Sequence, residues 1–287
     1  KSQRFLGTIY MTHEYGHFDI NKAINYYTLA ANQNDDDSQC NLGSIYFNGI
    51  YVQKNIEKAL YYYELAANNN NAVALHNLGL IYYQGEYVSR DINKSINYLT
   101  RSANLNYALA QYGLGEIYDI ADFVSRDINK ALYYFTLAAD NNEVKAQVRL
   151  GEIYSSGVFG TKDINKSIYY LSLAFKQNNI RASFLLGLIY SEFPDIKKAI
   201  YYLTIAANKN HIDAQYQLGK LIVKYDRKNI DNAIHYFTLA ANQNHTEAQY
   251  ILGIIYHNND VNRKDATKAV YYLTLASNQN HAGAQFE

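Results

Sequence analysis

Apolar residues recur along this chain at the spacing of amphipathic helices. The run from Ala74 to Tyr82 places apolar or small residues at positions i, i+4, i+7 and i+8, which fall on one face of an α-helix. A second kind of run, such as 128–139, also carries its apolar and small residues at helical spacing. The two kinds of run follow each other along the chain, so the pattern predicts pairs of helices, which we term helix A and helix B.

Two short signatures recur in step and define a repeat. A Leu-Gly pair in helix A places its glycine at Gly7, Gly43, Gly79, Gly115, Gly151, Gly187, Gly219 and Gly253. A small residue in helix B, which follows a lysine in all but the seventh copy, keeps the same pace at Ala23, Ala59, Ser95, Ala131, Ser167, Ala199, Ala233 and Ala269. The glycines are 36 residues apart five times, then 32 and 34. Such a period is typical of repeat architectures, in which each unit stacks on its neighbours.

The repeat divides the chain into eight units of one helix A and one helix B. The units cover approximately residues 1–34, 36–70, 72–106, 108–142, 144–178, 180–210, 212–244 and 246–280, with a partial ninth at 281–287. We interpret residues 1–287 as one repeat array. Because the array starts and stops inside a helix A, without the polar capping repeats that such arrays need, we expect it to be a piece of a longer chain.

Polar residues mark where each helix B begins and ends. Its expected N-caps are Asp19, Asn55, Asp91, Asp127, Asp163, Asp195, Asn229 and Asp265. These side chains can accept a hydrogen bond from a free backbone N–H of the first turn. After each helix B stands an asparagine, at Asn34, Asn70, Asn106, Asn142, Asn178, Asn210, Asn244 and Asn280. Asparagine tolerates the left-handed backbone that ends a helix, so this repetition has a conformational explanation.

The motif A-x-x-x-L-G-x-x-Y, followed by D-x-x-K-A and then A-A, resembles the Sel1-like repeat family, relatives of tetratricopeptide repeats. The resemblance covers essentially the whole chain. It implies an all-α fold, a right-handed α/α solenoid superhelix of about eight helix-turn-helix repeats of 32–36 residues, whose inner surface binds proteins or peptides. Two units depart from the pattern. Unit six has a short loop around Pro194, and unit seven has Ile222 in place of a tyrosine, so we expect altered stacking near residues 191–228.

The charge balance argues against partners that are bound mainly by charge. Lys plus Arg and Asp plus Glu both number 26, so the net charge is zero. Proteins that bind nucleic acids or anionic membranes usually depend on an excess of positive charge. No stretch reaches the ~18 apolar residues of a membrane span. We therefore expect neither nucleic-acid binding nor membrane insertion.

Candidate chemistry is sparse. The run from His13 to His17 matches H-E-x-x-H, but that zinc signature requires both histidines on one helix face, and the repeat places it in a loop. Three aligned histidines, His211, His245 and His281, follow the helix-ending asparagines, and we expect a capping or surface role. Cys40 has no partner for a disulfide, which fits a buried side chain and a cytoplasmic protein. We expect no metal site, cofactor or catalytic residue, and we interpret tyrosines such as Tyr46 and Tyr82 as packing residues.

The variable positions of helix A form the candidate binding surface. They lie two residues before the Leu-Gly glycine, one after it and five after it, which places them on one side of the helix. We term these positions the helix A stripe. Its candidate partner-binding residues are Leu80, Glu116, Ile120, Arg149, Glu152, Leu185, Leu188, Lys220, Ile251 and Ile254. Four of the apolar candidates form a set that either contacts a partner or packs against a neighbouring helix: Leu185, Leu188, Ile251 and Ile254.

The sequence therefore favours a non-catalytic scaffold or adaptor that binds a protein or peptide. Two alternatives stay open. The array could serve as the accessory region of a multidomain enzyme, such as a protein kinase whose catalytic domain lies outside this sequence. It could also act as a structural tether in a large assembly.

Overall fold

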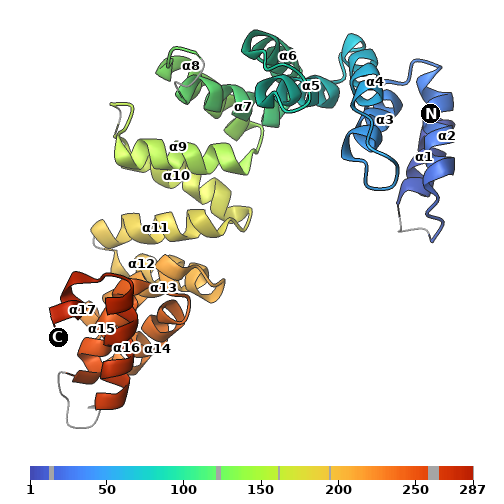
Figure 1. Ribbon diagram of the computed structural model, residues 1–287. Coiled ribbons are helices and arrows are strands. Elements are labelled where there is room, and N and C mark those ends of the chain that lie inside the picture. The colour runs from blue at the N-terminus through green and yellow to red at the C-terminus, as the bar shows by residue number, and fades with distance from the viewer. Residues whose placement is uncertain (13–15, 121–123, 161, 194, 258–264, 287) are drawn as a thin grey trace. The chain divides into compact units, whose positions relative to one another are not determined.

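The computed structural model describes residues 1–12, 16–120, 124–160, 162–193, 195–257 and 265–286, and all regular secondary structure in them is helical (Figure 1). The chain divides into two compact parts, Lys1–Gln147 and Val148–Glu287. These two parts are called the first and the second unit below, and each pair of one helix A and one helix B is called a repeat. The first contains α1 (Ser2–Met11), α2 (Ile20–Ala31), α3 (Asp36–Asn48), α4 (Ile56–Asn68), α5 (Ala72–Gln84), α6 (Ile92–Asn104), α7 (Ala108–Asp119) and α8 (Ile128–Asp140). Helix α9 (Val144–Ser156) contains the boundary between the units.

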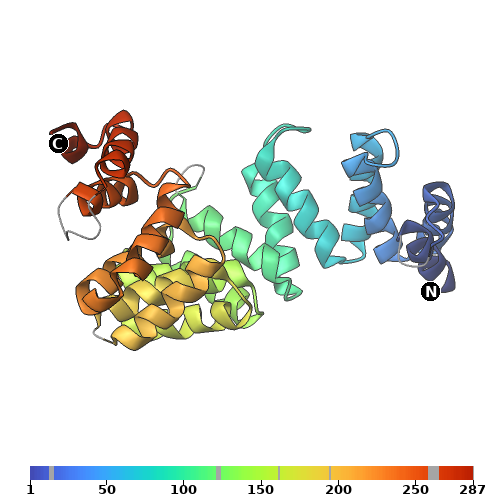
Figure 2. The same ribbon diagram turned by 90° about the horizontal axis from the view of Figure 1, so that it is seen from below.

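The second unit continues the same alternation. Its helices are α10 (Ile164–Lys176), α11 (Ile180–Glu192), α12 (Ile196–Asn208), α13 (Ile212–Tyr225), α14 (Ile230–Ala241), α15 (Thr246–His257), α16 (Ala266–Asn278) and α17 (Ala282–Phe286), with a 3-10 turn at Arg227–Asn229. Odd-numbered helices are the predicted helices A, and even-numbered ones are the predicted helices B. Within each unit a helix A packs against the helix B that follows it, as α3 does on α4 and α11 on α12 (Figures 1 and 2). The predicted all-α class and the pairing of helices are confirmed.

The repeated glycine allows each pair of helices to approach closely. A Cβ atom added to Gly115 would lie 2.5 Å from Cδ1 of Phe135, and one added to Gly79 would lie 2.7 Å from Cγ of Leu99. Both distances are shorter than van der Waals contact, so even a methyl group has no room. Phe135 and Leu99 are themselves buried. The Leu-Gly signature is therefore a packing requirement of the helix A–helix B contact.

A buried glutamine links each of several repeats to the next one. The Nε2 atom of Gln111 donates to the backbone carbonyl of Ala103 at 3.1 Å, and Gln215 donates to that of Ala207 at 3.2 Å. Both acceptors lie at the end of the preceding helix B, where carbonyl groups lack helical partners. Gln111 and Gln215 are 1% and 0% exposed, so these bonds satisfy groups that water cannot reach.

The predicted caps of helix B are confirmed at seven of the eight positions. Asp91, for example, accepts a hydrogen bond from the backbone N–H of Lys94 at 2.9 Å. The same bond forms at Asp19, Asn55, Asp127, Asp163, Asp195 and Asp265. The prediction was wrong for Asn229, whose side chain makes no capping bond because a 3-10 turn precedes α14. There the Asn229 amide donates to Asp226 at 3.2 Å instead.

The asparagine that follows each helix B has the predicted left-handed backbone. All eight have positive φ angles, from 57° at Asn70 to 63° at Asn34. After Asn70, for example, the N–H of Asn71 donates to the carbonyl of Ala66 at 3.0 Å, which is the hydrogen bond of a Schellman ending. Each helix B therefore ends through the same backbone device.

The tyrosines at fixed repeat positions pack as predicted. Tyr46 stacks on Tyr62 with ring centroids 6.0 Å apart and planes within 6° of parallel. The equivalent stack persists in the sixth repeat, where the ring centroids of Tyr190 and Tyr202 lie 5.7 Å apart. In the seventh repeat the buried Ile222 occupies the tyrosine position, so this stack is lost there. The altered packing expected near residues 191–228 is therefore found in the seventh repeat, while the sixth repeat keeps its stack.

Candidate protein-binding surface

The helix A stripe is accessible to solvent along both units. Each described residue of the stripe is partly or fully exposed, whereas the Leu-Gly pair between stripe positions is buried from the second repeat onward. In α5, for example, Leu78 and Gly79 are buried, and Leu80 beside them is partly exposed. The difference arises because helix B covers one side of each helix A, and the stripe lies away from that contact. The stripe is thus free to touch another molecule.

The stripe residues of the first unit have different surroundings. Leu80 lines an open groove between α3 and α5 together with Asn48, Asn77 and Gln84, so polar groups dominate that surface. Glu116 is exposed and accepts a hydrogen bond from the Tyr112 hydroxyl group at 2.8 Å.

Ile120 departs from the expected helical position. It is the C-cap of α7, with an extended backbone, and its side chain is 46% exposed. It therefore lies just beyond the helix A stripe, because α7 ends at Asp119, whereas α3, α5 and α9 each continue to their equivalent of Ile120.

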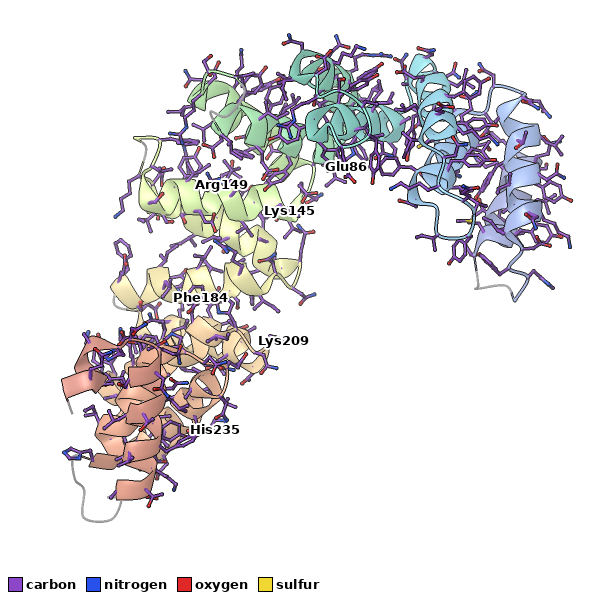
Figure 3. All side chains as sticks on the ribbon, in the orientation of Figure 1. Glu86, Lys145, Arg149, Phe184, Lys209 and His235 are labelled. Atoms are coloured by element: carbon purple, nitrogen blue, oxygen red, sulfur yellow. The ribbon has the colours of Figure 1, made fainter. Side chains whose placement is uncertain are left out.

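Two stripe residues of the second unit belong to an ion-pair cluster. Arg149 and Glu152 lie on α9 (Figure 3 labels Arg149), and their charged groups are 3.7 Å apart. Glu152 also pairs with Arg181 of α11 at 2.7 Å. Two guanidinium groups therefore share one carboxylate at this part of the surface.

The apolar stripe residues are only partly covered. Leu185, Leu188 and Ile254 are each of intermediate exposure. Ile251 is also partly exposed, and it packs against the core cluster that contains Leu218 and Phe237. These side chains are neither fully buried nor fully open, as expected of residues at the edge between core and surface.

One groove of the second unit combines two stripe candidates, Lys220 and Ile251. We term it the α13–α15 groove. It has a volume of about 490 Å³ and is lined by Ser191, Leu203, Gln217, Lys220, Leu221, Val223, Lys224, Ile230, Phe237, Ile251 and Ile255. The sequence pattern missed Val223, Ile230 and Ile255, because apolar residues beside the stripe look like core residues in a repeat. Lys224 lies on the stripe. A second lysine four positions after Lys220 was a sequence signal that both lie on the same side of the helix.

Three histidines of the second unit cap helices, and no cluster that could hold a metal ion is found around them in the part of the chain that the structure describes. The Nδ1 atoms of His211, His245 and His281 accept hydrogen bonds from backbone N–H groups three residues later, at 3.3, 3.1 and 3.1 Å. Each ring also stacks on an aromatic ring of the preceding helix A, as His211 does on Phe184 at 4.4 Å (Figure 3 labels Phe184 on α11). The predicted capping role is confirmed.

No group of three or more His, Cys, Asp or Glu residues in the described ranges could hold a metal ion. Three residues of the zinc-like motif, 13–15, lie outside the described residues. None of the described helices has the length and apolarity that crossing a bilayer requires.

The His211 cap should make stability depend on pH. Burial lowers the pKa of the His211 imidazole below its ordinary value of 6.5, and Asp213 partly opposes this shift. The unfolded chain therefore binds a proton more readily than the folded chain. The stabilisation by the neutral ring is complete above about pH 6.5 and is lost as the pH falls through the lower pKa of the folded state. Protonation at Nδ1 also removes the acceptor for the Ala214 N–H.

We expect the variant His211→Asn to lose less stability than the parent protein between about pH 7.5 and about pH 5.5. Asparagine caps the equivalent helices at Asn71 and Asn179, so the variant keeps a cap that does not titrate. Urea unfolding at the two pH values measures the difference, which we expect to be about 1 kcal/mol, the usual contribution of a cap. Equal losses in the two proteins would show that His211 does not contribute to the pH dependence.

Comparison with known proteins identifies the repeat. The Sel1 repeat model matches eight consecutive segments, residues 1–35, 36–71, 72–107, 108–143, 144–179, 180–211, 212–245 and 246–281. The structure is similar to that of c5321, a protective antigen of uropathogenic Escherichia coli strains that displays an SLR fold, with a TM-score of 0.91 and 24% sequence identity. The similarity covers 99% of this chain and 62% of that protein.

A second solved structure supports the same fold. A Sel1 repeat protein from Oxalobacter formigenes has a TM-score of 0.70 and 26% identity, over 99% of this chain and 84% of its own. Among curated proteins, none matches this chain at a significant level. The family match and these two structures agree that the chain is an α/α solenoid of eight repeats.

Proposed function

The chain belongs to the Sel1 repeat family, and from that premise we propose that it is a non-catalytic scaffold or adaptor that binds a protein or peptide on its helix A stripe. Repeat proteins of this kind generally mediate contacts between proteins. The observation that carries the proposal is the accessibility of the stripe. Each described stripe residue is at least partly exposed, although it lies beside a buried Leu-Gly pair.

The variability of the stripe supports a recognition role. Buried positions of the repeat hold the same small or apolar residues from repeat to repeat, since close packing dictates them. Stripe positions are free of that requirement, and they change from Asn77 and Leu80 in α5 to Gln217 and Lys220 in α13. Such a surface can differ in chemistry along the array, as binding to one particular partner requires.

The double variant Leu185→Ser and Leu188→Ser tests the proposal. Both side chains are partly exposed, so we expect the fold to persist and partner binding to weaken by about tenfold or more, because apolar contacts at the centre of an interface dominate its affinity. The measurement is an affinity pull-down of the full chain from a lysate of its source organism, quantified by mass spectrometry. Circular dichroism and the urea midpoint report on the fold.

The matched control is Tyr201→Ser in α12, the helix B of the same repeat. The Tyr201 ring is 55% exposed, so this change also removes an apolar group from the surface, but on the other helix. We expect the control to keep its partners. Partners that both variants retain at fixed stoichiometry would favour a structural tether instead. Unfolding of the double variant would show that Leu185 and Leu188 belong to the core.

A further inference from the structure

The α13–α15 groove has an apolar floor with charged residues on one rim. Leu203, Leu221 and Phe237 are buried at its base, while Ile251 and Ile255 line its side and are partly exposed. Its volume of about 490 Å³ is far more than a water molecule needs. The space is therefore large enough for apolar side chains of another molecule.

The rim of the groove carries two lysines that pair with no carboxylate among the described residues. Lys220 and Lys224 are exposed and lie four positions apart on α13, so their Cβ atoms are about 6 Å from each other. Their ammonium groups lie over the rings of Tyr216 and Tyr225, at 5.2 and 4.8 Å from the centroids. None of the described residues that line the groove is acidic. The rim therefore presents two positive charges that are not neutralised by any described residue around it.

Several lysines at the start of a helix B pair with the carboxylate of its N-cap. Lys198, on α12 of the preceding repeat, lies 3.1 Å from Asp195, and Lys268 on α16 lies 3.2 Å from Asp265. Those lysines stabilise the first turn of a helix B, and a carboxylate already neutralises the charge of each one. Lys220 and Lys224 make no such contact in the described part of the chain, so a carboxylate from outside would be their first.

The equivalent groove of the first unit has a different chemistry. Between α3 and α5, the positions of Lys220 and Lys224 are Ser44 and Asn48 on α3, and the position of Ile251 in the facing helix α5 is Asn77. The α3–α5 groove thus has uncharged polar groups at its rim and less apolar surface. The repeat does not require two lysines or an isoleucine at these positions, since the same fold forms without them.

We propose that the α13–α15 groove binds an acidic peptide segment of another protein, with a large apolar side chain on the floor and two carboxylates on Lys220 and Lys224. The inference rests on the proposed function and specifies the chemistry of the partner at one part of the helix A stripe. The apolar floor supplies affinity through burial, and the two lysines supply specificity for acidic sequences. A peptide fits this combination better than a nucleic acid, which needs many phosphate contacts and has no aliphatic side chain for the floor.

Binding is measured by fluorescence anisotropy with the full chain. The probe is a fluorescein-labelled peptide of about twelve residues, in which a Leu-Ile pair is flanked by a glutamate on each side. Three comparison peptides replace both glutamates by glutamine, both by lysine, or the Leu-Ile pair by two serines. We expect the glutamate peptide to bind about tenfold more tightly than each of the others, and its affinity to fall as NaCl is added.

The charge-reversed variant Lys220→Glu and Lys224→Glu provides the decisive test. Both side chains are exposed, so the fold should persist, and the preference should change from the glutamate peptide to the lysine peptide. The matched control is Asn48→Glu and Gln84→Glu, at exposed positions of the α3–α5 groove, which should leave the preference unchanged.

The outcomes separate this inference from the proposed function. Equal binding of the glutamate and glutamine peptides, or an unchanged preference in the charge-reversed variant, overturns the inference. Binding of a single-stranded oligonucleotide in place of the peptides, or self-association of the chain through this groove in sedimentation experiments, also overturns it. In each of these cases the proposed scaffold function stands if the folded double variant Leu185→Ser and Leu188→Ser still weakens partner capture, and it fails if that variant captures partners as well as the parent protein does.

Discussion

Replacing Gly115 by alanine is expected to lower the free energy of unfolding by about 1–3 kcal/mol, the usual range for adding a methyl group to a packed core. The new Cβ atom would lie 2.5 Å from Cδ1 of Phe135 and 2.6 Å from its Cε1. The Phe135 ring is 0% exposed, so it cannot move away into solvent. Helices α7 and α8 would have to separate, and the loss of their packing is the physical reason for the effect.

Gly113→Ala is the matched control, two residues away on the same helix. Its added methyl group would lie 3.9 Å from Cδ1 of Leu99, which is an ordinary contact distance. Alanine in a helix is more stable than glycine by about 0.5–1 kcal/mol, so this variant should be slightly more stable than the parent protein. Urea unfolding followed by circular dichroism gives both values. A loss of stability in Gly113→Ala equal to that in Gly115→Ala would contradict the packing argument, because the two sites would then respond alike despite their different surroundings.

The thiol of Cys40 should be almost unreactive in the folded protein. Burial raises the pKa of Cys40 from 9.0 to about 12, and the carboxylates of Asp37 and Asp36 act in the same direction. The thiolate is the reactive form, so at about pH 8 a pKa higher by three units lowers the reactive fraction about 1,000-fold. Its side chain, 6% exposed, is also screened from reagents. We therefore expect Ellman's reagent to label the native protein far more slowly than the protein in concentrated urea.

The chain has one cysteine, so the signal comes from a single site. The control is the double variant Cys40→Ala and Asn48→Cys, which moves the thiol to an exposed position eight residues later on the same helix. That thiol should react at the ordinary rate in the folded protein. If native Cys40 reacts as fast as the exposed thiol does, α3 opens readily and the repeat is less tightly packed than its geometry indicates.

Features of the fold that depend on local backbone chemistry were predictable from the sequence. The eight asparagines after helix B were predicted to adopt a left-handed backbone, and all eight have positive φ angles. Seven of the eight predicted caps form because an Asp or Asn side chain needs only its own first turn to make the bond. The failure at Asn229 has a local cause as well. The 3-10 turn at Arg227–Asn229 alters the entry into α14, and no residue type in that segment signals the turn.

Features that depend on neighbouring repeats were harder to predict. A glutamine recurs four residues before the Leu-Gly glycine in several repeats, at Gln39, Gln111, Gln147, Gln215 and Gln249, but the pattern does not show what it binds. Only the structure shows that Gln111 reaches the carbonyl of Ala103 in the preceding helix B. The acceptor is supplied by the approach of two repeats, which is a tertiary property.

For the candidate binding surface too, the sequence predicted one part and the tertiary structure decided the rest. The period of the Leu-Gly pair determined where the stripe lies, because a helix has 3.6 residues per turn and every third or fourth residue shares a face. It could not determine which stripe residues meet. The tertiary structure decided that Lys220 and Ile251, on two different helices, line one groove, while Arg149 and Glu152 join Arg181 in an ion-pair cluster. The sequence by itself determined the helices, their ends and the repeat, since these follow from interactions within a few residues. The packing of one repeat on the next determined the shape and the charge of the surface, because those contacts join residues about one repeat apart in the chain.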